Sequence, residues 1–581
     1  IHGVNIPARS VSGDFYDIMP LPDGRIWFNV ADVSGKGMNA ALLMAKTSSL
    51  FRCLAKSAED PGQLLNAINN ELCETNSHGM FVTMVGGLFH PETGVARVAF
   101  LLQSLRALDR DLRRLGSRLV VRRGDPVQEL VTVVKACGAD AVIAHTDCER
   151  IVGRVRDAAV NRRLAAEGIP IRWIEPSGAS PDLLSYTAWR RQWQAAMKEP
   201  EATLPGRLPL PSLAATVLPD QPIPDLQELG LPASRTPLPP AGTGAALERL
   251  NSFCDGPASR SYFWELSYPS ARVTSGLSPY LKFGVISPRQ VLQPLAGLAQ
   301  QGGARQRSAR QLASRLRWGA GMHQRFRHLP QLEIHSLWSA FDEPGSTSLD
   351  SQGQELYEAW RLGRTGFPIV DAAARCLAAE GGWLELNFRS RAIYASFLAN
   401  LCGIDWRLGA LHFMRQLIDG DCPIDHYQWA MQAGVTMAGS AAWTRIYHPG
   451  QVAVDRCDPQ GLFIRRWLPE LAELTNDQLG CPPPMAAYPR PILDYESARR
   501  RRLETLERQR QQIGDVRQAM ARPPRDGDGA ALDLFPVAVD LDSLEPRQWS
   551  ALLSWFRPGR STDRNGAAPS PRRSKARREA P

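Results

Sequence analysis

Cysteine is scarce in this sequence, and its spacing excludes the common cysteine-based metal motifs. Ten cysteines occur among 581 residues, and no two of them form a C-x-x-C pair. Zinc knuckles and many iron–sulfur clusters depend on such pairs. We therefore interpret the cysteines as buried thiols.

Long apolar runs and a secretory signal are also missing. No hydrophobic stretch approaches the roughly 20 residues that cross a bilayer. The residues after Ile1 lack the basic, apolar and small-residue succession of a signal peptide, and we expect the natural start to lie upstream. These absences predict a cytoplasmic protein with no membrane partner, and we expect a monomer.

The excess of positive charge is modest and unevenly placed. The formal net charge is +9, and much of it lies in residues 499–502 and 572–578. Such arginine runs are typical of solvated segments. The net charge permits an anionic partner but does not by itself predict nucleic-acid binding.

The chain is too long for one hydrophobic core. About 100–200 residues per domain predicts roughly three folded units. Prolines recur between residues 200 and 244 without any helical or strand period, which predicts a linker. The predicted division is a first block at 1–95, a second at 96–199, the linker at 200–244, a third block at 245–475, a helical extension at 476–522 and a mostly disordered tail at 523–581.

The first block is rich in β-type residues and glycine, and it places Asp14 and Asp32 where apolar strands enter tight turns. Carboxylates in that position suit Mg²⁺ or Mn²⁺, which prefer oxygen ligands. From the residues alone, ordinary turn aspartates are the favoured interpretation. These motifs, with residues 40–44 after them, resemble the opening of stage-II-sporulation-type metal-dependent serine/threonine phosphatases. That family completes a two-metal site with further aspartates that are missing here. The resemblance therefore implies a partial α+β fragment without activity.

The second block alternates helices and strands, which predicts a parallel, Rossmann-like α/β sheet. The expected helices are 100–115, 127–138 and 154–167, and the expected strands are 119–122, 139–144 and 170–173. Residues 102–109 and 124–126 resemble the N-terminal antenna domain of photolyases. The first strand and helix of that family are absent, so the resemblance implies a truncated domain. It also implies a second chromophore of folate or deazaflavin type.

The third block shows apolar residues at three- and four-residue spacing, which predicts an all-α domain. The expected helices are 307–326, 356–362, 369–379, 389–401 and 410–417. Tryptophan is abundant in this block. Most tryptophans in a helical domain belong to the core, although some could stack on a flat ligand or relay electrons.

Five ordered motifs give the third block its closest resemblance. They are residues 274–281, 361–371, 404–407, 413–421 and 461–471, and together they resemble the FAD-binding domain of the photolyase/cryptochrome family. The first of them joins hydroxyls and a glycine to a helix start, an arrangement that can gather phosphate but also fits a simple helix cap. The resemblance implies bound FAD and damaged DNA as the partner.

The resemblance assigns cofactor contacts residue by residue. Around the FAD pyrophosphate it places Tyr262, Thr274, Ser275, Gly276, Leu277 and Ser278, and beside the flavin and adenine it places Asn387, Arg391, Asp419, Asp421 and Asp425. Arg391 and Asp419 would form a buried ion pair. Asp425 stands where photolyases usually carry Asn and plant cryptochromes carry Asp, and its carboxyl group could protonate flavin N5.

The resemblance also assigns electron supply. Trp406 matches the middle member of the family's aromatic chain, and Tyr427 matches the flavin-proximal member if two residues are deleted after Asp425. The outer position corresponds to Asp350, which cannot serve. Trp338 and Trp360 are alternative exits.

Substrate contact is expected from Trp318 and Trp429, which match the two tryptophans that stack on the flipped-out dimer. Arg315 replaces the carboxylate expected near the first of them. The asparagine that faces the flavin is either replaced by Phe388 or displaced to Asn387. The function predicted first is light-driven repair of pyrimidine dimers. The alternatives are a cryptochrome-like light sensor acting through signalling partners, and a phosphatase with the flavin domain as regulatory passenger.

Overall fold

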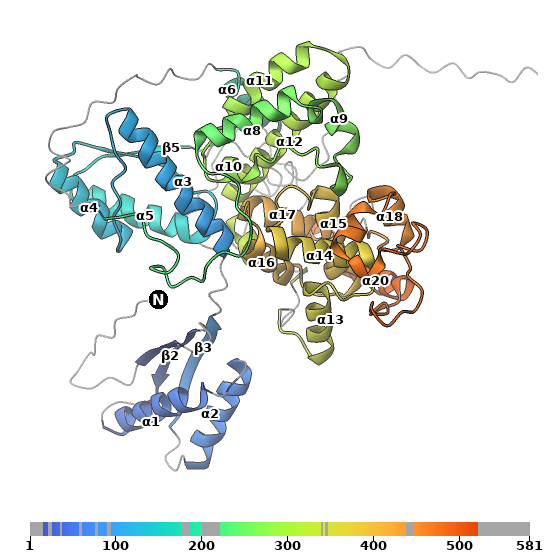
Figure 1. The fold of residues 1–581 in the computed structure, drawn as a ribbon. Coiled ribbons are helices and arrows are strands. Elements are labelled where there is room, and N and C mark those ends of the chain that lie inside the picture. The colour runs from blue at the N-terminus through green and yellow to red at the C-terminus, as the bar shows by residue number, and fades with distance from the viewer. Residues whose placement is uncertain are drawn as a thin grey trace, which may run out of the picture. The chain divides into compact units, whose positions relative to one another are not determined.

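The computed structural model divides the chain into two compact units, residues 1–93 and 94–581 (Figure 1). The residues that the structure describes are 15–20, 26–34, 38–56, 58, 61–75, 80–89, 94–175, 186–199, 221–337, 341–342, 347–436 and 446–520. The predicted tail at 523–581 and Asp14 lie outside these residues. No described helix is long and apolar enough to cross a membrane.

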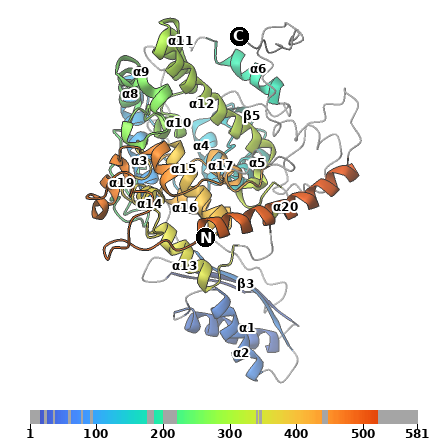
Figure 2. The ribbon, with the colours of Figure 1, turned by 90° about the vertical axis from the view of Figure 1, so that its right-hand side faces the viewer.

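The first unit has a three-stranded antiparallel sheet and two helices. The strands β1 (Phe15–Pro20), β2 (Ile26–Val33) and β3 (Val82–Phe89) pair in the order β1-β2-β3. The helices α1 (Met38–Leu54) and α2 (Pro61–Thr75) both lie on one side of the sheet (Figure 2). The core joins Trp27 of β2 to Phe51 of α1 and Leu64 of α2. The unit is therefore α+β, with more helix than its β-type residues suggested.

The second unit begins with an α/β part. It contains α3 (Val95–Arg114), α4 (Pro126–Cys137), β4 (Val142–His145), α5 (Ile151–Ala166) and β5 (Ile171–Ile174). The strands β4 and β5 are parallel, with Val142 opposite Ile171. Residues Val131, Val160 and Leu164 form a small core between the helices and these strands.

The predicted strand at 119–122 is wrong. Its backbone and side chains bond to neighbouring side chains instead of to a strand: the Leu119 N–H donates to Asp109 Oδ1 at 3.0 Å, and Arg122 Nε donates to Glu129 at 2.9 Å. The next residue, Arg123, bonds through its N–H to the Gln221 side chain at 2.7 Å and through its guanidinium to the Pro222 carbonyl. Residues 221–222, in the middle of the predicted linker, therefore lie along this segment.

The rest of the second unit is a helical body. Its helices are α8 (Thr243–Asp255), α9 (Ala258–Glu265), α10 (Ser278–Lys282), α11 (Pro288–Gln300), α12 (Gly303–His328), α13 (Ser351–Arg361), α14 (Pro368–Glu380), α15 (Phe388–Ser396), α16 (Trp406–Gln416), α17 (Cys422–Gln432), α18 (Gln451–Cys457), α19 (Leu462–Trp467) and α20 (Tyr495–Met520). Side-chain caps begin several of them, including Asp350 for α13, Asn387 for α15 and Asp421 for α17. Helices at all five predicted positions are confirmed, and α20 lies in the predicted helical extension.

Two helices from the predicted antenna block belong to the core of the helical body. Phe100 of α3 is fully buried against Tyr280, with ring centroids 5.5 Å apart. Trp189, from α6 (Tyr186–Ala196), is also fully buried and lies in the same hydrophobic cluster as Phe326 of α12. The packing therefore runs across the predicted linker.

Candidate functional site

A cavity of about 620 Å³ lies where the α/β part of the second unit meets the helical body. Its wall is formed by the end of β4 with the loop after it (residues 145–149) and by α10, α12, α15, α16 and α17. Six of the predicted site residues line it: Ser278, Arg391, Asp419, Asp421, Asp425 and Trp429. Predicted site residues that are up to 151 positions apart in the sequence, from Ser278 to Trp429, are thus brought to one wall.

Arg391 and Asp419 lie together in this wall as predicted. The guanidinium contacts both carboxylate oxygens at 3.4 Å, and it donates shorter bonds to the carbonyls of Gly382 (2.7 Å) and Leu386 (2.9 Å). The Asp419 side chain is nearly buried, at 9% exposed, whereas Arg391 is 28% exposed. Arg391 therefore orders the loop before α15 and places a positive charge at the cavity.

Asp421 is the centre of a second charged group. His323 Nε2 lies 3.1 Å from one carboxylate oxygen and Lys282 Nζ 3.3 Å from the other, and Lys282 also bonds to Glu149 from the loop after β4. Burial alone would raise the pKa of Asp421, but His323 and Lys282 hold it below its ordinary value. The same carboxylate caps α17 by accepting from Ile424 N–H at 3.1 Å.

Asp425 behaves differently from Asp421 although both line the cavity. Burial raises the pKa of Asp425, and the nearby His426 only partly opposes this effect. Its Oδ2 is buried and has no hydrogen-bond partner among the described residues, and the closest contact is His426 Nδ1 at 3.4 Å. A carboxyl group with a raised pKa and one unused oxygen is suited to donating a proton to a ligand.

Of the residues predicted to surround the FAD pyrophosphate, Ser278 lines the cavity and the others do not. Gly276 adopts φ +64°, a left-handed conformation that favours glycine at this turn. The Thr274 hydroxyl bonds to the Leu384 carbonyl, the Ser275 carbonyl accepts from Arg249, and Leu277 is buried. Tyr262 packs edge-on against Phe253 in a hydrophobic cluster.

Asn387 is the N-cap of α15 and does not line the cavity. Its Oδ1 accepts from the N–H groups of Arg389 and Ser390, both at 3.0 Å. Phe388 lies under the guanidinium of Arg315, 4.7 Å from its ring centroid. Arg315 lines the cavity and also lies 5.7 Å from the ring of the half-buried Trp318. Trp318 itself is outside the wall.

The predicted electron donors Trp406 and Tyr427 also lie outside the wall. Trp406 donates to the Ser336 hydroxyl at 2.9 Å and meets His426 edge-on, with ring centroids 5.9 Å apart. Tyr427 lies under Arg325 at 4.9 Å. Asp350 caps α13 by accepting from Gly353 N–H. Trp338 is outside the described residues.

Comparisons with known proteins identify this architecture. The deoxyribodipyrimidine photo-lyase of Halobacterium salinarum is 31% identical over 440 residues, which cover 71% of this chain and 88% of the relative. The chain belongs to the DNA photolyase/cryptochrome family. A cryptochrome DASH from Gloeobacter violaceus is 33% identical over 70% of this chain and 81% of its own length. A solved class III photolyase from Agrobacterium tumefaciens superimposes with a TM-score of 0.59 at 27% identity, covering 72% of this chain and 90% of that one.

Family models locate the similarity along this photolyase/cryptochrome chain. The model described as the FAD binding domain of DNA photolyase matches residues 312–508, and the DNA photolyase model matches 64–177. The stage II sporulation protein E model matches residues 22–100, which agrees with the predicted resemblance of the first block.

Several residues of this photolyase-type cavity were not predicted from the sequence. Lys282, His323 and Glu149 carry the charges around Asp421, and Asp147 also lines the wall. Lys282 lies four residues after Ser278, so a helical reading of that motif places both on one face. No local pattern indicated Glu149, because its contact with Lys282 joins residues 133 positions apart in the sequence.

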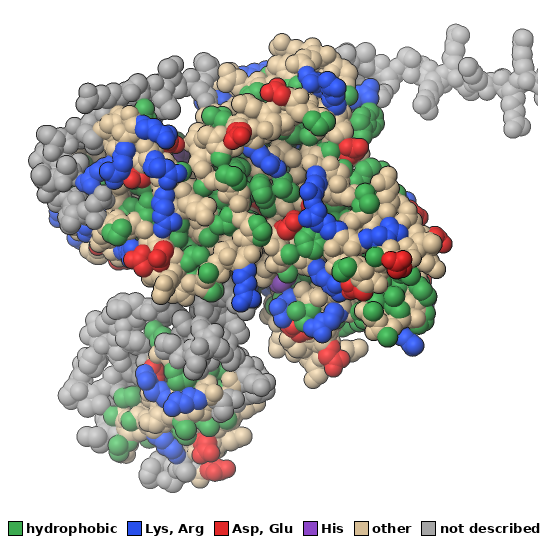
Figure 3. Space-filling model, in the orientation of Figure 1, with side chains coloured by type: hydrophobic (Ala, Val, Ile, Leu, Met, Phe, Trp, Pro, Cys, Tyr) green, Lys and Arg blue, Asp and Glu red, His purple; other side chains and the backbone are tan. Residues whose placement is uncertain are grey.

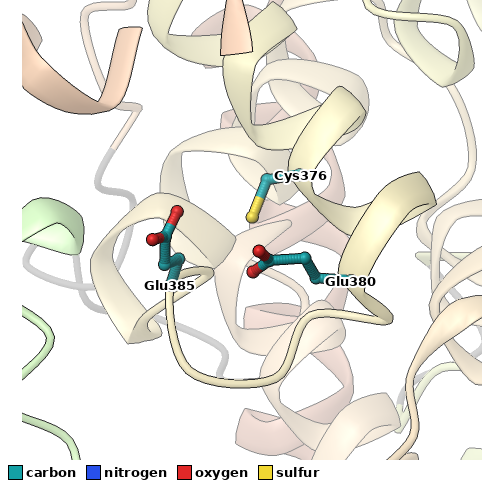
Figure 4. Close-up of side chains that lie close together, drawn as sticks. All are labelled: Cys376, Glu380 and Glu385. Carbon is teal, nitrogen blue, oxygen red and sulfur yellow. The ribbon is translucent and has the colours of Figure 1, made fainter. Parts of the chain in front are cut away.

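The metal site predicted for the first unit has little support. Asp14 is outside the described residues, and Asp32, at the end of β2, is exposed. In the described part of the chain, one group of potential metal ligands lies close together: Cys376, Glu380 and Glu385 (Figure 4). Arg466 contacts both carboxylates, and Arg272 and the Trp467 indole also bond to Glu385. We interpret this group as an ion-pair cluster, because its charges are already compensated.

The charges around Asp421 predict a stability that depends on pH. Burial would lower the pKa of His323, but Asp421 raises it above the ordinary value of about 6.5. The His323 contribution is therefore complete below about pH 6.5 and is lost as pH rises through the raised value. Asp421 contributes above about pH 4, and its share is lost only as pH falls through its lowered pKa.

Thermal melts from about pH 5 to about pH 9 test this linkage. We expect His323→Gln to lower the melting temperature most at the acid end of that range, with the difference from the wild type shrinking as pH rises. His335, which is 60% exposed and lies 3.5 Å from Asp342, is the surface control, and at the acid end His335→Gln should lower the melting temperature far less than His323→Gln does. A constant difference for His323→Gln would contradict the assignment.

Proposed function

We propose that this protein binds FAD in the 620 Å³ cavity and uses light to repair pyrimidine dimers in DNA. The observation that carries the proposal is the meeting of Arg391, Asp419, Asp421 and Asp425 in one wall, within a chain of the photolyase/cryptochrome family. The deoxyribodipyrimidine photo-lyase and class III photolyase relatives support the enzyme class, a carbon–carbon lyase.

The cavity is suited to FAD in size and chemistry. Its volume falls within the range of about 300–1,000 Å³ usual for cofactor sites. The wall offers the cationic side chains Arg391, Lys282 and His323 for an anionic ligand, and the unused Asp425 Oδ2 for a ring nitrogen. When bound and reduced, FAD supplies an electron to the dimer after absorbing light.

The protein's own residues set the conditions for this chemistry. Arg391 places a fixed positive charge in the wall, which favours a negatively charged reduced cofactor. Burial raises the pKa of Asp425, which favours the protonated form of its carboxyl group at the cavity. The loop after β4 closes one side of the wall through Lys282 and Glu149, which limits the access of water.

A second cavity supports DNA as the partner. It has a volume of about 520 Å³ and lies between α15, α18 and α20. Arg389, Arg456 and Arg499 line it, together with Tyr447 and Tyr495, and its wall contains no Asp or Glu. Arginines without nearby carboxylates are suited to the phosphates of a DNA backbone. Figure 3 shows further Lys and Arg side chains over α3 and across the helical body, with acidic side chains among them.

Trp318 and Trp429, the two tryptophans predicted to stack on the dimer, differ in how exposed their rings are. Trp318 is half-buried, so a base can approach its ring. Trp429 lines the FAD cavity and is only 2% exposed. Phe413 and Trp360 contact its ring edge-on, with centroids 5.0 Å and 6.1 Å away. We therefore propose Trp318 as the main stacking residue for a flipped-out dimer.

The proposal is tested with FAD-reduced protein and ultraviolet-damaged oligothymidylate under blue light. We expect recovery of thymine absorbance in the wild type and loss of most of it in Trp318→Ala, because stacking contributes about 1–3 kcal/mol per base. Trp264→Ala is the matched control, since Trp264 is an exposed tryptophan outside both cavities. Absence of recovery in the wild type would overturn the repair function.

The DNA contact is tested separately by the double substitution Arg389→Glu and Arg456→Glu. Because each lost phosphate contact reduces the salt slope by about 0.9, we expect weaker binding and a slope lower by roughly two. A fluorescence-anisotropy titration of damaged duplex at several salt concentrations measures both. An unchanged slope would show that DNA binds elsewhere.

A light sensor of cryptochrome type is the second candidate, favoured by Asp425 and by the cryptochrome DASH relative. Photoreduction of bound flavin without thymine recovery would select it, with a signalling protein as partner.

A phosphatase function is supported only by the match of residues 22–100 to the sporulation-protein model. We also propose a folate or deazaflavin chromophore for the α/β part, and a monomeric protein in the cytoplasm.

A further inference from the structure

Arg315 lies in the wall of the proposed FAD cavity and has no acidic partner there. Its guanidinium carbon lies 4.7 Å from the ring centroid of Phe388 and 5.7 Å from that of Trp318. Among the residues that the structure describes, none forms a hydrogen bond or an ion pair with this guanidinium. Aromatic faces attract a guanidinium but leave its N–H groups free. Arg315 therefore offers its donors to a ligand.

The carboxylates of the same wall do not compensate the charge of Arg315. Asp419 contacts Arg391 at 3.4 Å, and Asp421 contacts Lys282 at 3.3 Å. In the described part of the chain, no carboxylate forms an ion pair with Arg315. An anionic group that comes beside Arg315 thus meets a positive charge that no carboxylate competes for, and a planar guanidinium with free N–H groups is suited to phosphate.

Phe388 connects the wall of the FAD cavity with that of the 520 Å³ cavity proposed for DNA. It is half-buried at the start of α15, and a second guanidinium, from Arg389, lies 5.0 Å from its ring centroid. Arg315 lines the first cavity and Arg389 lines the second. The one aromatic ring therefore holds an arginine of each cavity, which makes a positive path from the DNA cavity to the FAD cavity.

Trp318 indicates which phosphate can reach Arg315. The two residues are three positions apart in α12 and so share a face of the helix. Trp318 is the residue proposed above to stack on a flipped-out dimer. A nucleotide that leaves the duplex carries its backbone phosphate with it, and Arg315 lies beside the ring on which its base would stack. A base that stays in the duplex does not bring a phosphate to this position.

We propose that Arg315 binds the backbone phosphate of the flipped-out lesion and that Phe388 positions its guanidinium. The inference rests on the function proposed above and names a residue that distinguishes damaged from undamaged DNA. Arg389 binds phosphate whether or not a base is flipped, because it lines the other cavity. Arg315 binds phosphate only when the lesion has entered.

The pairing also accounts for two departures from the family pattern. The resemblance predicts a carboxylate at position 315 and an asparagine at or next to position 388, and in this chain the side chains at 315 and 388 contact each other. A carboxylate would repel a phosphate, and an asparagine has no aromatic face to support a guanidinium. The two replacements are therefore complementary.

The test is a fluorescence-anisotropy titration of the FAD-loaded full chain with two duplexes that differ only in one thymine dimer. We expect Arg315→Gln to weaken binding of the damaged duplex about 10- to 100-fold and to lower its salt slope by about 0.9, because one phosphate contact is lost. Binding of the undamaged duplex should not change, which also shows that the variant is folded. Arg317→Gln, in the same helix but outside both cavities, is the matched control and should follow the wild type.

Substitution of Phe388 tests its positioning role. Phe388→Leu removes the aromatic face but keeps the charge of Arg315, so affinity for the damaged duplex should fall about threefold with an unchanged salt slope. Phe388→Tyr keeps the ring and should restore the wild-type affinity. A purely structural role would instead weaken binding of both duplexes.

The affinity for FAD separates the lesion phosphate from the pyrophosphate of the cofactor. Flavin fluorescence should give the same FAD affinity for Arg315→Gln and the wild type. Weaker FAD binding in this variant, an unchanged salt slope with the damaged duplex, or an equal fall with both duplexes would overturn the inference. A wild type that binds both duplexes equally would overturn the proposed function itself.

Discussion

Replacement of Asp371 by Ala is expected to lower the free energy of unfolding by about 3–5 kcal/mol. Asp371 is fully buried, and its carboxyl group accepts from the Thr365 N–H (2.8 Å), the Thr365 hydroxyl (2.7 Å), the Gly366 N–H (3.1 Å) and the Tyr488 hydroxyl. Truncation leaves all of these donors buried without an acceptor. Urea unfolding followed by tryptophan fluorescence measures the change.

Matched variants separate the hydrogen bonds from the lost volume. Asp371→Asn keeps one oxygen as acceptor and should cost less than Asp371→Ala. Tyr488→Phe removes one donor and should cost about 1 kcal/mol. In the double variant Asp371→Ala with Tyr488→Phe, the loss of unfolding free energy should be smaller than the sum of the two single losses, because both substitutions remove the same contact. An additive result would show that the Tyr488 contact contributes nothing.

Replacement of Arg391 by Ala is expected to weaken FAD binding by about 2–3 kcal/mol, or about 30- to 150-fold. The wall contains five acidic side chains, from Asp147, Glu149, Asp419, Asp421 and Asp425, and Lys282 and His323 compensate Asp421. Without Arg391, Asp419 would face the anionic cofactor uncompensated. The loop carbonyls at Gly382 and Leu386 would also lose their donor.

Flavin fluorescence during titration of the apoprotein measures this affinity. Arg391→Lys keeps the charge but cannot donate to both carbonyls and to Asp419 at once, so we expect an intermediate loss. Thermal melts of the apoprotein show whether each variant is folded. A wild-type affinity in folded Arg391→Ala would place the cofactor outside this wall.

The sequence predicted the helical part well where local signals were strong. The periods at 307–326 and 369–379 became α12 and α14, because their apolar faces are buried on the core; Pro368 also opens α14, and Gly381 in the left-handed conformation ends it. Arg391 and Asp419 were brought together as the family resemblance implied. Local pattern and ordered motifs are therefore sufficient for much of this site.

Long-range packing accounts for what the sequence did not predict. The segment at 119–122 has strand-like residues, but its bonds go to the Asp109 and Glu129 side chains, a choice that local propensity does not encode. Glu149 reaches Lys282 only because the loop after β4 closes the cavity. The aromatic contacts of Trp360 likewise join α13, α15 and α17, which are separate in sequence.

The burial of Phe100 and Trp189 in the helical body limits where such a gene can be recombined. Both residues precede the proline-rich segment at 200–244, yet their packing partners include Tyr280 and the cluster that contains Phe326. A helical body that began at residue 245 would lack the Phe100 and Trp189 side chains that fill part of its core. The position at which a foreign module can be joined without such loss lies before Gly94, where the compact units divide, and not at the prolines.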